Sequence, residues 1–127
     1  MTTELPDDRR YTAEHEWVLV DGEVVRIGIT DYAQEQLGDV VFVDLPEPGS
    51  QVQQGQSFGE VESTKSVSDL YAPISGVVVE RNDHLDDQPE LVNSDPYGQG
   101  WLITIRAEDV AQVEGLLDAT AYRGLVE

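Results

Sequence analysis

The chain has no cysteine, which excludes disulfide bonds, thiolate metal sites and cysteine nucleophiles. Its two histidines, His15 and His84, lie far apart in the sequence and show no metal-ligand spacing. The longest apolar runs, such as Val77-Val78-Val79, fall well short of the ~20 residues that a membrane-spanning helix needs. The 127 residues, 39% of them hydrophobic, suffice for one domain with an ordinary core.

Positive charge is scarce. Twenty-six acidic residues stand against seven basic ones, and the net charge is −19. Such a surface argues against binding to nucleic acid or to anionic membranes, because both need lysine and arginine. It suits brief, repeated docking on less acidic enzymes, since charge raises encounter rates, but it also fits a role in solubility alone.

Lysine is scarcer still. Six of the seven basic residues are arginines, and the only lysine of the chain is Lys65. An ordinary solvated surface would carry several lysines, so this position stands out.

The first ten residues contain no apolar run and are rich in acid, which fits neither a secretory signal nor a transit peptide. We therefore expect a mature cytoplasmic protein of bacterial type. We expect residues 1–127 to form a single domain, with residues 1–10 as a flexible N-terminal extension.

The first half of the chain reads as strands around one short helix. We predict strands over residues 11–20 and 24–29, joined by a hairpin turn at Asp21-Gly22. Asp31 is predicted to cap a helix over residues 32–37, with Gln34 completing the cap and Gly38 ending the helix. A buried strand over residues 40–45 follows. Trp17, Phe42 and Trp101 are predicted core residues.

The second half continues in short strands. Strands are predicted over residues 57–62, 67–71, 76–80 and 101–105, with a loop over residues 93–100. The tail is predicted to be helical, from the spacing of Val110, Val113, Leu116 and Leu117. Asp118 is predicted to cap a final helix with Tyr122, Leu125 and Val126 on one face. The expected fold is mainly β, a small sandwich or flattened barrel of short strands with a short internal helix and a C-terminal helical segment.

Lys65 lies in the turn between two of these strands, flanked by Thr64 and Ser66. Small hydroxyl residues suit a tight exposed turn and leave the amine accessible. A lysine offers a flexible stem and a nucleophilic nitrogen, as acylation requires. From the turn alone, an acylation site and a purely structural charge on a hairpin are both open.

The segment Glu62-Ser63-Thr64-Lys65-Ser66 resembles the lipoylation hairpin of glycine cleavage H proteins. The resemblance extends in order over residues 11–122 and covers several further blocks: His15-Glu16-Trp17-Val18, residues 28–34, residues 37–43, Pro73-Ile74-Ser75-Gly76, Leu91-Val92-Asn93, and Asp95-Pro96-Tyr97-Gly98 with Gly100-Trp101. A lone lysine turn is weak support for a family, whereas ordered blocks over most of the chain are specific.

The resemblance implies a lipoyl-domain-like fold and lipoate bound covalently as an amide on Lys65. It implies a carrier with no catalytic group of its own, which passes an aminomethyl group from a pyridoxal-phosphate glycine decarboxylase to a tetrahydrofolate-dependent aminomethyltransferase. Dihydrolipoamide dehydrogenase would then reoxidise the arm, and a lipoylating enzyme would attach it. The absence of cysteine agrees, because the redox-active sulfurs would all belong to lipoate.

Five further residues are predicted to have roles. Glu62 and Gly76 are predicted to help a lipoylating enzyme recognise the turn: Glu62, three residues before Lys65, would meet a basic group of that enzyme, and Gly76 would permit a close backbone approach or an unusual φ where the hairpin joins the sheet. Glu16, Asp69 and Glu14 are predicted to shelter the loaded arm, although Glu14 stands where some relatives carry serine. The acidic start of the chain and Ser66 after the lysine are also departures from the family pattern.

Other functions stay open at this stage. A lipoyl or biotinyl domain of a ketoacid dehydrogenase or carboxylase would use a similar turn, but lacks the flanking blocks. An H-like protein that donates lipoyl groups to other proteins would use the same lysine. An unmodified interaction module would use none. A free-standing enzyme is disfavoured, because no paired acid and base or activated nucleophile is visible.

Overall fold

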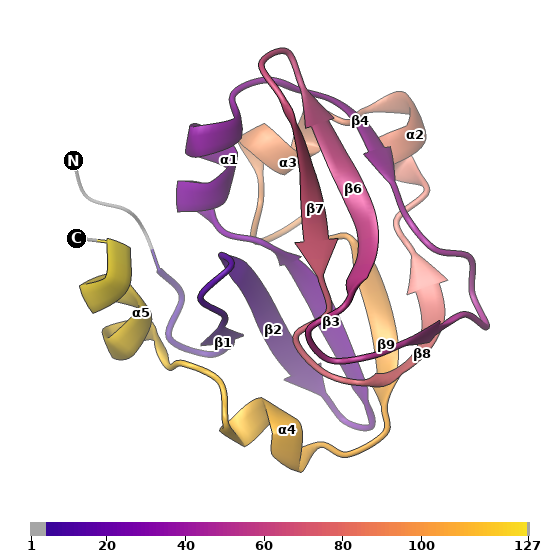
Figure 1. The fold of residues 1–127 in the computed structure, drawn as a ribbon, viewed down its shortest axis with the longest axis vertical. Coiled ribbons are helices and arrows are strands. Elements are labelled where there is room, and N and C mark those ends of the chain that lie inside the picture. Colours follow the sequence, from indigo (N-terminus) through magenta and orange to yellow (C-terminus); the bar gives the residue numbers. More distant parts are fainter. Residues whose placement is uncertain (1–4, 127) are drawn as a thin grey trace.

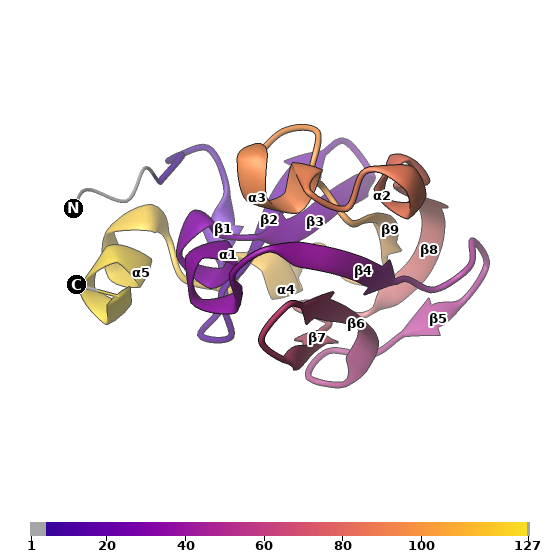
Figure 2. The ribbon, with the colours of Figure 1, turned by 90° about the horizontal axis from the view of Figure 1, so that it is seen from above.

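The structure, a computed structural model, describes residues 5–126. Two antiparallel sheets pack face to face, and short helices lie around their edges (Figures 1 and 2). The larger sheet has the order β1 (Arg10–Tyr11), β2 (Glu16–Asp21), β3 (Val24–Ile29), β9 (Ile103–Ala107), β8 (Gly76–Arg81) and β5 (Gln51–Val52). The smaller sheet has the order β4 (Val40–Asp44), β6 (Ser57–Ser63) and β7 (Val67–Tyr71). The sheets do not close on one another, so of the two expected forms the fold is the sandwich.

Five helices accompany the strands over the described residues: α1 (Asp31–Leu37), α2 (His84–Asp87), α3 (Leu91–Ser94), α4 (Ala111–Glu114) and α5 (Ala119–Val126). The helix α1 lies beside the β6–β7 hairpin, whose turn projects past both sheets (Figure 1). The helix α5 lies at the periphery, next to β1.

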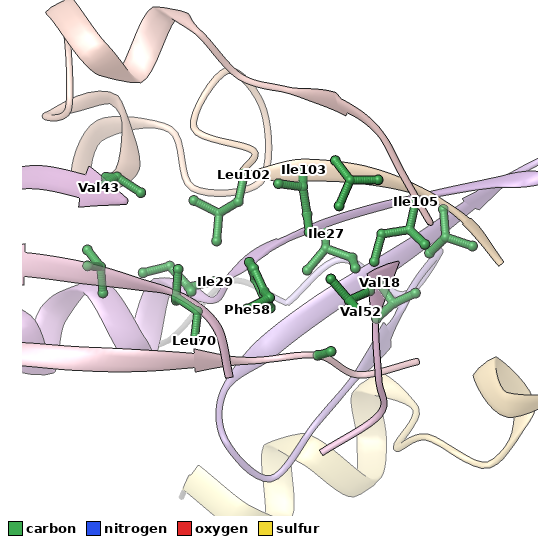
Figure 3. Packing of buried hydrophobic residues seen from close by; sticks show 14 of the residues in the cluster. Val18, Ile27, Ile29, Val43, Val52, Phe58, Leu70, Leu102, Ile103 and Ile105 are labelled. Carbon is green, nitrogen blue, oxygen red and sulfur yellow. The ribbon is translucent and has the colours of Figure 1, made fainter. Parts of the chain in front are cut away.

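The main core fills the space between the sheets (Figure 3). Ile27 and Ile105 point into it from the larger sheet, and Val61 and Leu70 from the smaller one; all four are buried. Their positions follow the two-residue alternation of strands, which places every second side chain inward. Each such side chain stabilises the fold by about 1.5–3 kcal/mol when it leaves water.

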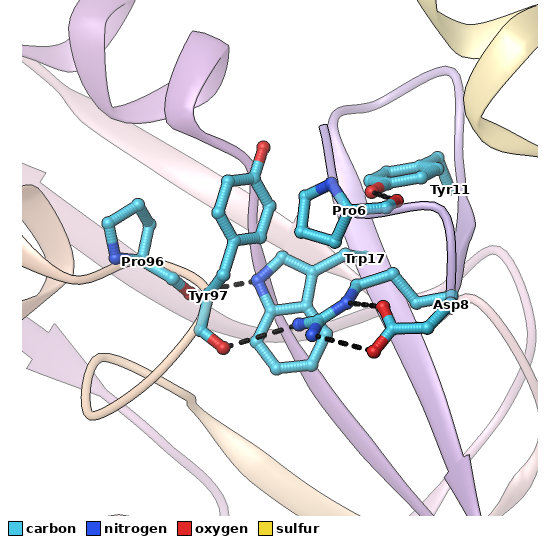
Figure 4. Close-up of polar contacts among 7 residues, drawn as sticks. Pro6, Asp8, Tyr11, Trp17, Pro96 and Tyr97 are labelled. Atoms are coloured by element: carbon cyan, nitrogen blue, oxygen red, sulfur yellow. Dashed lines mark hydrogen bonds and ion pairs between the residues drawn. The ribbon is translucent and has the colours of Figure 1, made fainter. Parts of the chain in front are cut away.

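A second apolar cluster joins the two ends of the chain. It comprises Leu5, Tyr11, Trp17, Ala119 and Tyr122. The Trp17 indole donates to the Pro96 carbonyl at 2.9 Å, and the Tyr11 hydroxyl donates to the Pro6 carbonyl (Figure 4).

Part of the segment that we expected to be a flexible extension is therefore packed. The Arg9 guanidinium lies 4.8 Å from the Trp17 ring centre, and Leu5 is buried in the second cluster. Apolar and cation–π contacts hold residues 5–10 on the body. Residues 1–4 fall outside the described residues, and so does that part of the prediction.

Two details of the first half differ from expectation. The single strand predicted over residues 11–20 is broken into β1 and β2 by a turn in which His15 has φ +72°. The cap of α1 is Thr30 rather than Asp31, because the Thr30 hydroxyl accepts a hydrogen bond from the Ala33 amide at 3.2 Å. Threonine and aspartate both cap helices well, so the sequence alone did not distinguish Thr30 from Asp31 as the cap. Gly38 ends α1 with φ +84°, as predicted.

The prediction that Phe42 belongs to the core is wrong. A register shift between Val40 and Phe42 breaks the alternation of β4, so that Val40 and Val43 point inward while Val41 and Phe42 point outward. Phe42 is 56% exposed. Trp17 is fully buried, as expected, whereas Trp101 is half-buried beneath the Arg26 guanidinium, 4.7 Å from its ring centre.

The second half is more broken than predicted. The start of the loop expected over residues 93–100 belongs to α3, and the last strand runs over Ile103–Ala107 instead of residues 101–105. The tail does not form one helix before Asp118, because α4 ends at Glu114, before Gly115. Asp118 does cap the final helix, through the Ala121 amide at 2.8 Å, but Leu125 is exposed and does not share the buried face of Tyr122.

Candidate functional site

Ser63, a buried residue two positions before Lys65, holds the turn that carries the lysine. The Ser63 hydroxyl accepts from the Lys65 amide at 3.2 Å and from the Ser66 amide at 3.1 Å. The Ser63 amide donates to the Ser66 carbonyl at 2.8 Å and closes the hairpin. Because these bonds use backbone groups and one inward side chain, the Lys65 side chain is left exposed.

A neighbouring segment supports the turn from below. The Thr64 amide donates to the Asp39 carbonyl at 3.0 Å, which ties the turn to the link between α1 and β4. Asn93 of α3 fixes that link: its side-chain oxygen accepts from the Val40 amide and its side-chain nitrogen donates to the Gly38 carbonyl, each at 2.9 Å. The turn therefore stands on a hydrogen-bonded base.

A cleft of about 210 Å³ begins directly beside the lysine turn. It has three walls: residues 66–70 along β7, three residues of α1, and residues 14–16 at the start of β2. The predicted acidic residues Glu14, Glu16 and Asp69 all line it, with an apolar floor that includes Ile29 and Val61. Residues distant in sequence thus meet in one cavity, which has both carboxylates and apolar surface.

Glu16 differs from the other two acids because it is only 2% exposed. It accepts hydrogen bonds from the Thr12 hydroxyl at 2.7 Å and from the Tyr71 amide at 3.0 Å. Burial raises the pKa of Glu16 to about 7, with the Thr12 and Tyr71 hydrogen bonds acting against the shift and the charge of Glu14 adding to it. Glu16 is therefore partly protonated near neutral pH, and it links the larger sheet to the end of β7.

His15 also lines the cleft, in a left-handed backbone conformation. Its Nδ1 lies 2.8 Å from the Tyr122 hydroxyl, and its ring packs 4.8 Å from that of Tyr32. Burial lowers its pKa, against the opposing charge of Glu14, so the ring is predominantly neutral at neutral pH. His15 is therefore a hydrogen-bonded structural residue of the cleft wall. Sequence reasoning missed its partner Tyr122, which lies 107 residues away and carries no local motif.

The two predicted recognition residues do not lie together. Glu62 is exposed on β6, near the turn, but Gly76 begins β8 in the other sheet. A methyl group on Gly76 would lie 2.3 Å from the Arg106 carbonyl oxygen, so the expected close backbone approach occurs between β8 and β9.

The outer face of the smaller sheet carries two rows of directly paired side chains. Nearer the turn, Glu62 pairs with exposed Phe42 on one side and exposed Val67 on the other. Two positions further along lies a second row, which we call the acidic row: Asp44, Glu60 and Asp69. Paired residues share a face. No residue of the acidic row has an ion-pair partner within residues 5–126.

The same span contains neither a metal-binding cluster nor a membrane-spanning helix. Residues 5–126 contain no group of three or more histidine and carboxylate side chains placed to hold a metal ion. Within that range, no helix is long and apolar enough to cross a membrane.

Comparisons with known proteins point to a single family. The family model described as "Glycine cleavage H-protein" matches residues 9–127. The chain is 57% identical over 124 residues to the glycine cleavage system H protein of Anaeromyxobacter sp. (strain K), covering 98% of this chain and 97% of that one. It is 61% identical over 127 residues to the protein of the same name from Mycobacterium avium (strain 104), covering 96% of each.

A solved structure gives the same result. The crystal structure of a glycine cleavage system H protein from Mycobacterium marinum superposes with a TM-score of 0.87 at 50% sequence identity, covering 94% of this chain and 97% of that one. The chain belongs to the glycine cleavage H-protein family, and it is a non-catalytic carrier subunit of the glycine cleavage system.

Proposed function

We propose that this carrier is lipoylated on Lys65 and shuttles an aminomethyl group from the pyridoxal-phosphate glycine decarboxylase to the tetrahydrofolate-dependent aminomethyltransferase. Dihydrolipoamide dehydrogenase then returns the arm to its disulfide form. The observation that carries the proposal is the position of the only lysine of the chain, exposed on a hairpin turn that is fixed at its base. When bound, lipoate supplies the reactive sulfurs that the chain itself lacks.

The residues beside the turn fit such a group. The cleft offers apolar contacts for a hydrocarbon arm, from Ile29, Leu37 and Val61, and carboxylates for an amine at its end. A neutral amine on the carbon bonded to sulfur would use its lone pair to break the carbon–sulfur bond, with the thiolate as leaving group, whereas the protonated amine has no free lone pair. Exposed Glu14 and Asp69 would favour its protonated, stable form. Glu16 would accept a hydrogen bond or donate one, because it is partly protonated near neutral pH.

The walls of the cleft would also restrict water. Sheltering the aminomethyl group matters because water captures the carbon fragment that is released when the carbon–sulfur bond breaks. The chain's own part in the reaction is therefore to bind and orient the arm, to hold a proton on the amine and to slow hydrolysis.

The outer face of the smaller sheet supplies a docking surface for the partner enzymes. Phe42 is 56% and Val67 57% exposed, and both lie next to Glu62 and the lysine turn. With the acidic row behind them, they would suit an enzyme that surrounds its active-site entrance with basic residues and a small apolar patch.

Intact mass of the chain from its native host, grown with and without lipoate supply, tests the proposal. We expect one lipoyl group on the wild type and none on Lys65→Arg, whose guanidinium keeps the charge but cannot form the amide. A lipoyl mass on folded Lys65→Arg, or none on the wild type under lipoate supply, would overturn the assignment; the second result would favour an unmodified interaction module.

Glycine turnover with the three purified partners then separates shuttle from donor. The lipoylated wild type is expected to support it and Lys65→Arg is not. A lipoylated chain that supports no turnover, but passes lipoyl groups to other acceptor proteins, would identify a donor instead.

A further inference from the structure

The C-terminal helix contributes a buried side chain, Tyr122, that contacts residues of the cleft walls. The helix α5 is otherwise peripheral, but Tyr122 is fully buried, and its ring stacks on that of Tyr11 at 4.9 Å with an interplanar angle of 13°. Stacking explains why the ring is buried, but not where its hydroxyl points.

The Tyr122 hydroxyl contacts two walls of the cleft at once. It lies 2.8 Å from Nδ1 of His15, which belongs to the wall at the start of β2. It also lies 2.8 Å from the Thr30 hydroxyl, which caps α1, the helix that forms another wall. A further bond, from the Thr30 amide to the His15 carbonyl at 3.0 Å, joins the same two segments.

We propose that Tyr122 is a positioning residue for the cleft, and that its hydroxyl holds the His15 wall and the helix α1 at a fixed separation. The use of the cleft by the loaded arm rests on the proposed function. The assignment of Tyr122 to the cleft rests on the contacts alone.

The backbone of His15 gives a reason why such a support is needed. A non-glycine residue at φ +72° is in a disfavoured backbone conformation, which persists only where surrounding contacts impose it. The Tyr122 hydroxyl and the ring of Tyr32 are contacts of that kind, and both are made by the imidazole.

The hydrogen bonds also select one form of the imidazole. Tyr122 has a single proton, so it donates to either His15 or Thr30 and accepts from the other. When Tyr122 donates to Nδ1 of His15, the Thr30 hydroxyl donates to Tyr122, and both hydroxyl hydrogens have an acceptor. In the reverse arrangement the buried Thr30 hydroxyl, which already accepts from the Ala33 amide, has no acceptor for its own hydrogen among the described residues. The first arrangement is therefore favoured, and it places the hydrogen of neutral His15 on Nε2.

The chain contains a matched control. Tyr11 is the stacking partner of Tyr122 and is equally buried, but its hydroxyl donates to the Pro6 carbonyl, away from His15 and Thr30. Tyr122→Phe and Tyr11→Phe therefore remove the same atom from the same aromatic pair, and only the first touches the cleft.

Two readouts test the proposal. On the unmodified chain, nitrogen NMR of the His15 ring is expected to report one dominant tautomer in the wild type and in Tyr11→Phe, and a mixture in Tyr122→Phe. On the lipoylated and loaded chain, loss of the cargo without the transferase is expected to be about three- to tenfold faster in Tyr122→Phe, the ratio that one hydrogen bond corresponds to. Tyr11→Phe is expected to match the wild type.

Thr30→Val removes the other hydrogen-bond partner of the Tyr122 hydroxyl, and Thr30→Ser keeps that partner. This pair of variants replaces Tyr122→Phe in both measurements if Tyr122→Phe does not fold. A wild-type tautomer and wild-type cargo loss in folded Tyr122→Phe, or equal changes in both phenylalanine variants, would overturn the proposal. A wild type that is never lipoylated would overturn the proposed function instead, and the tautomer measurement would still decide the role of Tyr122.

Discussion

The Lys65 side chain rests on Gly38: a methyl group at Gly38 would lie 3.0 Å from Cε of Lys65. Gly38 ends α1 at φ +84°, where a side chain is strained in any case. The free lysine thus lies back over the end of the helix that forms one wall of the cleft.

Gly38→Ala is therefore expected to displace the lysine stem and raise the rate at which a small acylating reagent modifies Lys65. Gly22→Ala is the control, because Gly22 also has positive φ, at +67°, but nothing lies within 4 Å of the added methyl. Gly38→Ala should lose about 1–3 kcal/mol of stability, because φ +84° with ψ −159° is almost confined to glycine, and Gly22→Ala should also be destabilised by its positive φ. Peptide mass spectrometry gives the acylation rates, and equal rates in the two variants would contradict the contact.

Glu16→Gln is expected to change how stability depends on pH. The folded pKa of about 7 is above the ordinary value of 4.5, so between these pH values the folded chain holds a proton that the unfolded chain has lost. The contribution of Glu16 to the free energy of unfolding thus falls as pH rises through this range, by up to roughly 3 kcal/mol, and is level above it.

Urea unfolding of wild type and Glu16→Gln at pH 5 to pH 8 measures this. The wild type should lose stability relative to the variant as pH rises. Asp21→Asn, an exposed acid on the same strand, is the control and should run parallel to the wild type. A constant difference between wild type and Glu16→Gln across this range would contradict the raised pKa.

Neutralising the acidic row should slow docking. The double variant Asp44→Asn, Glu60→Gln is expected to associate with the partner enzymes about three- to tenfold more slowly at low salt, with the difference vanishing at high salt. The pair Asp87→Asn, Glu90→Gln removes the same charge from exposed positions outside the smaller sheet. Stopped-flow association rates decide, and equal slowing by both pairs would assign the effect to net charge alone.

Substitutions at Glu62 and at Gly76 should have different effects on lipoylation and on stability. Glu62→Gln is expected to slow lipoylation while leaving the free energy of unfolding unchanged, because Glu62 is exposed beside the turn. Gly76→Ala is expected to destabilise the fold by about 1–3 kcal/mol, through the clash with the Arg106 carbonyl. Lipoylation rates per folded molecule show whether Gly76 also affects recognition. Wild-type rates in both would leave the position of Lys65 as the sole determinant.

Much of this architecture was predictable because its signals are local. The Asp21-Gly22 hairpin, the glycine that ends α1 and the strands on either side of Lys65 depend on neighbouring residues and on two-residue alternation. The helices α2, α3 and α4 were missed or misplaced because four residues are too few to show a helical period. Phe42 was placed in the core because a register shift leaves no mark in composition.

The cleft, too, was predictable only in part. Its three acids were found through a resemblance, but nothing in the residues around Glu16 indicates that it is buried while Glu14 is exposed. The contact between His15 and Tyr122 depends on how α5 returns to the body of the molecule. Such long-range contacts follow from packing, which no sequence window contains.

The hydrogen bonds of Asn93 beneath the lysine turn affect how a lipoyl arm on Lys65 would be distributed between the cleft and solvent. Because the turn is held by the Asp39 carbonyl and by Asn93, the anchor point has little freedom, and only the rotatable bonds beyond it move. A tethered group with a fixed anchor meets its own cleft at a high effective concentration. With Lys65 lipoylated as proposed, a partner's active site would compete with the carrier's own cleft, and its apparent affinity for the arm would be multiplied by the fraction of time that the arm is outside the cleft.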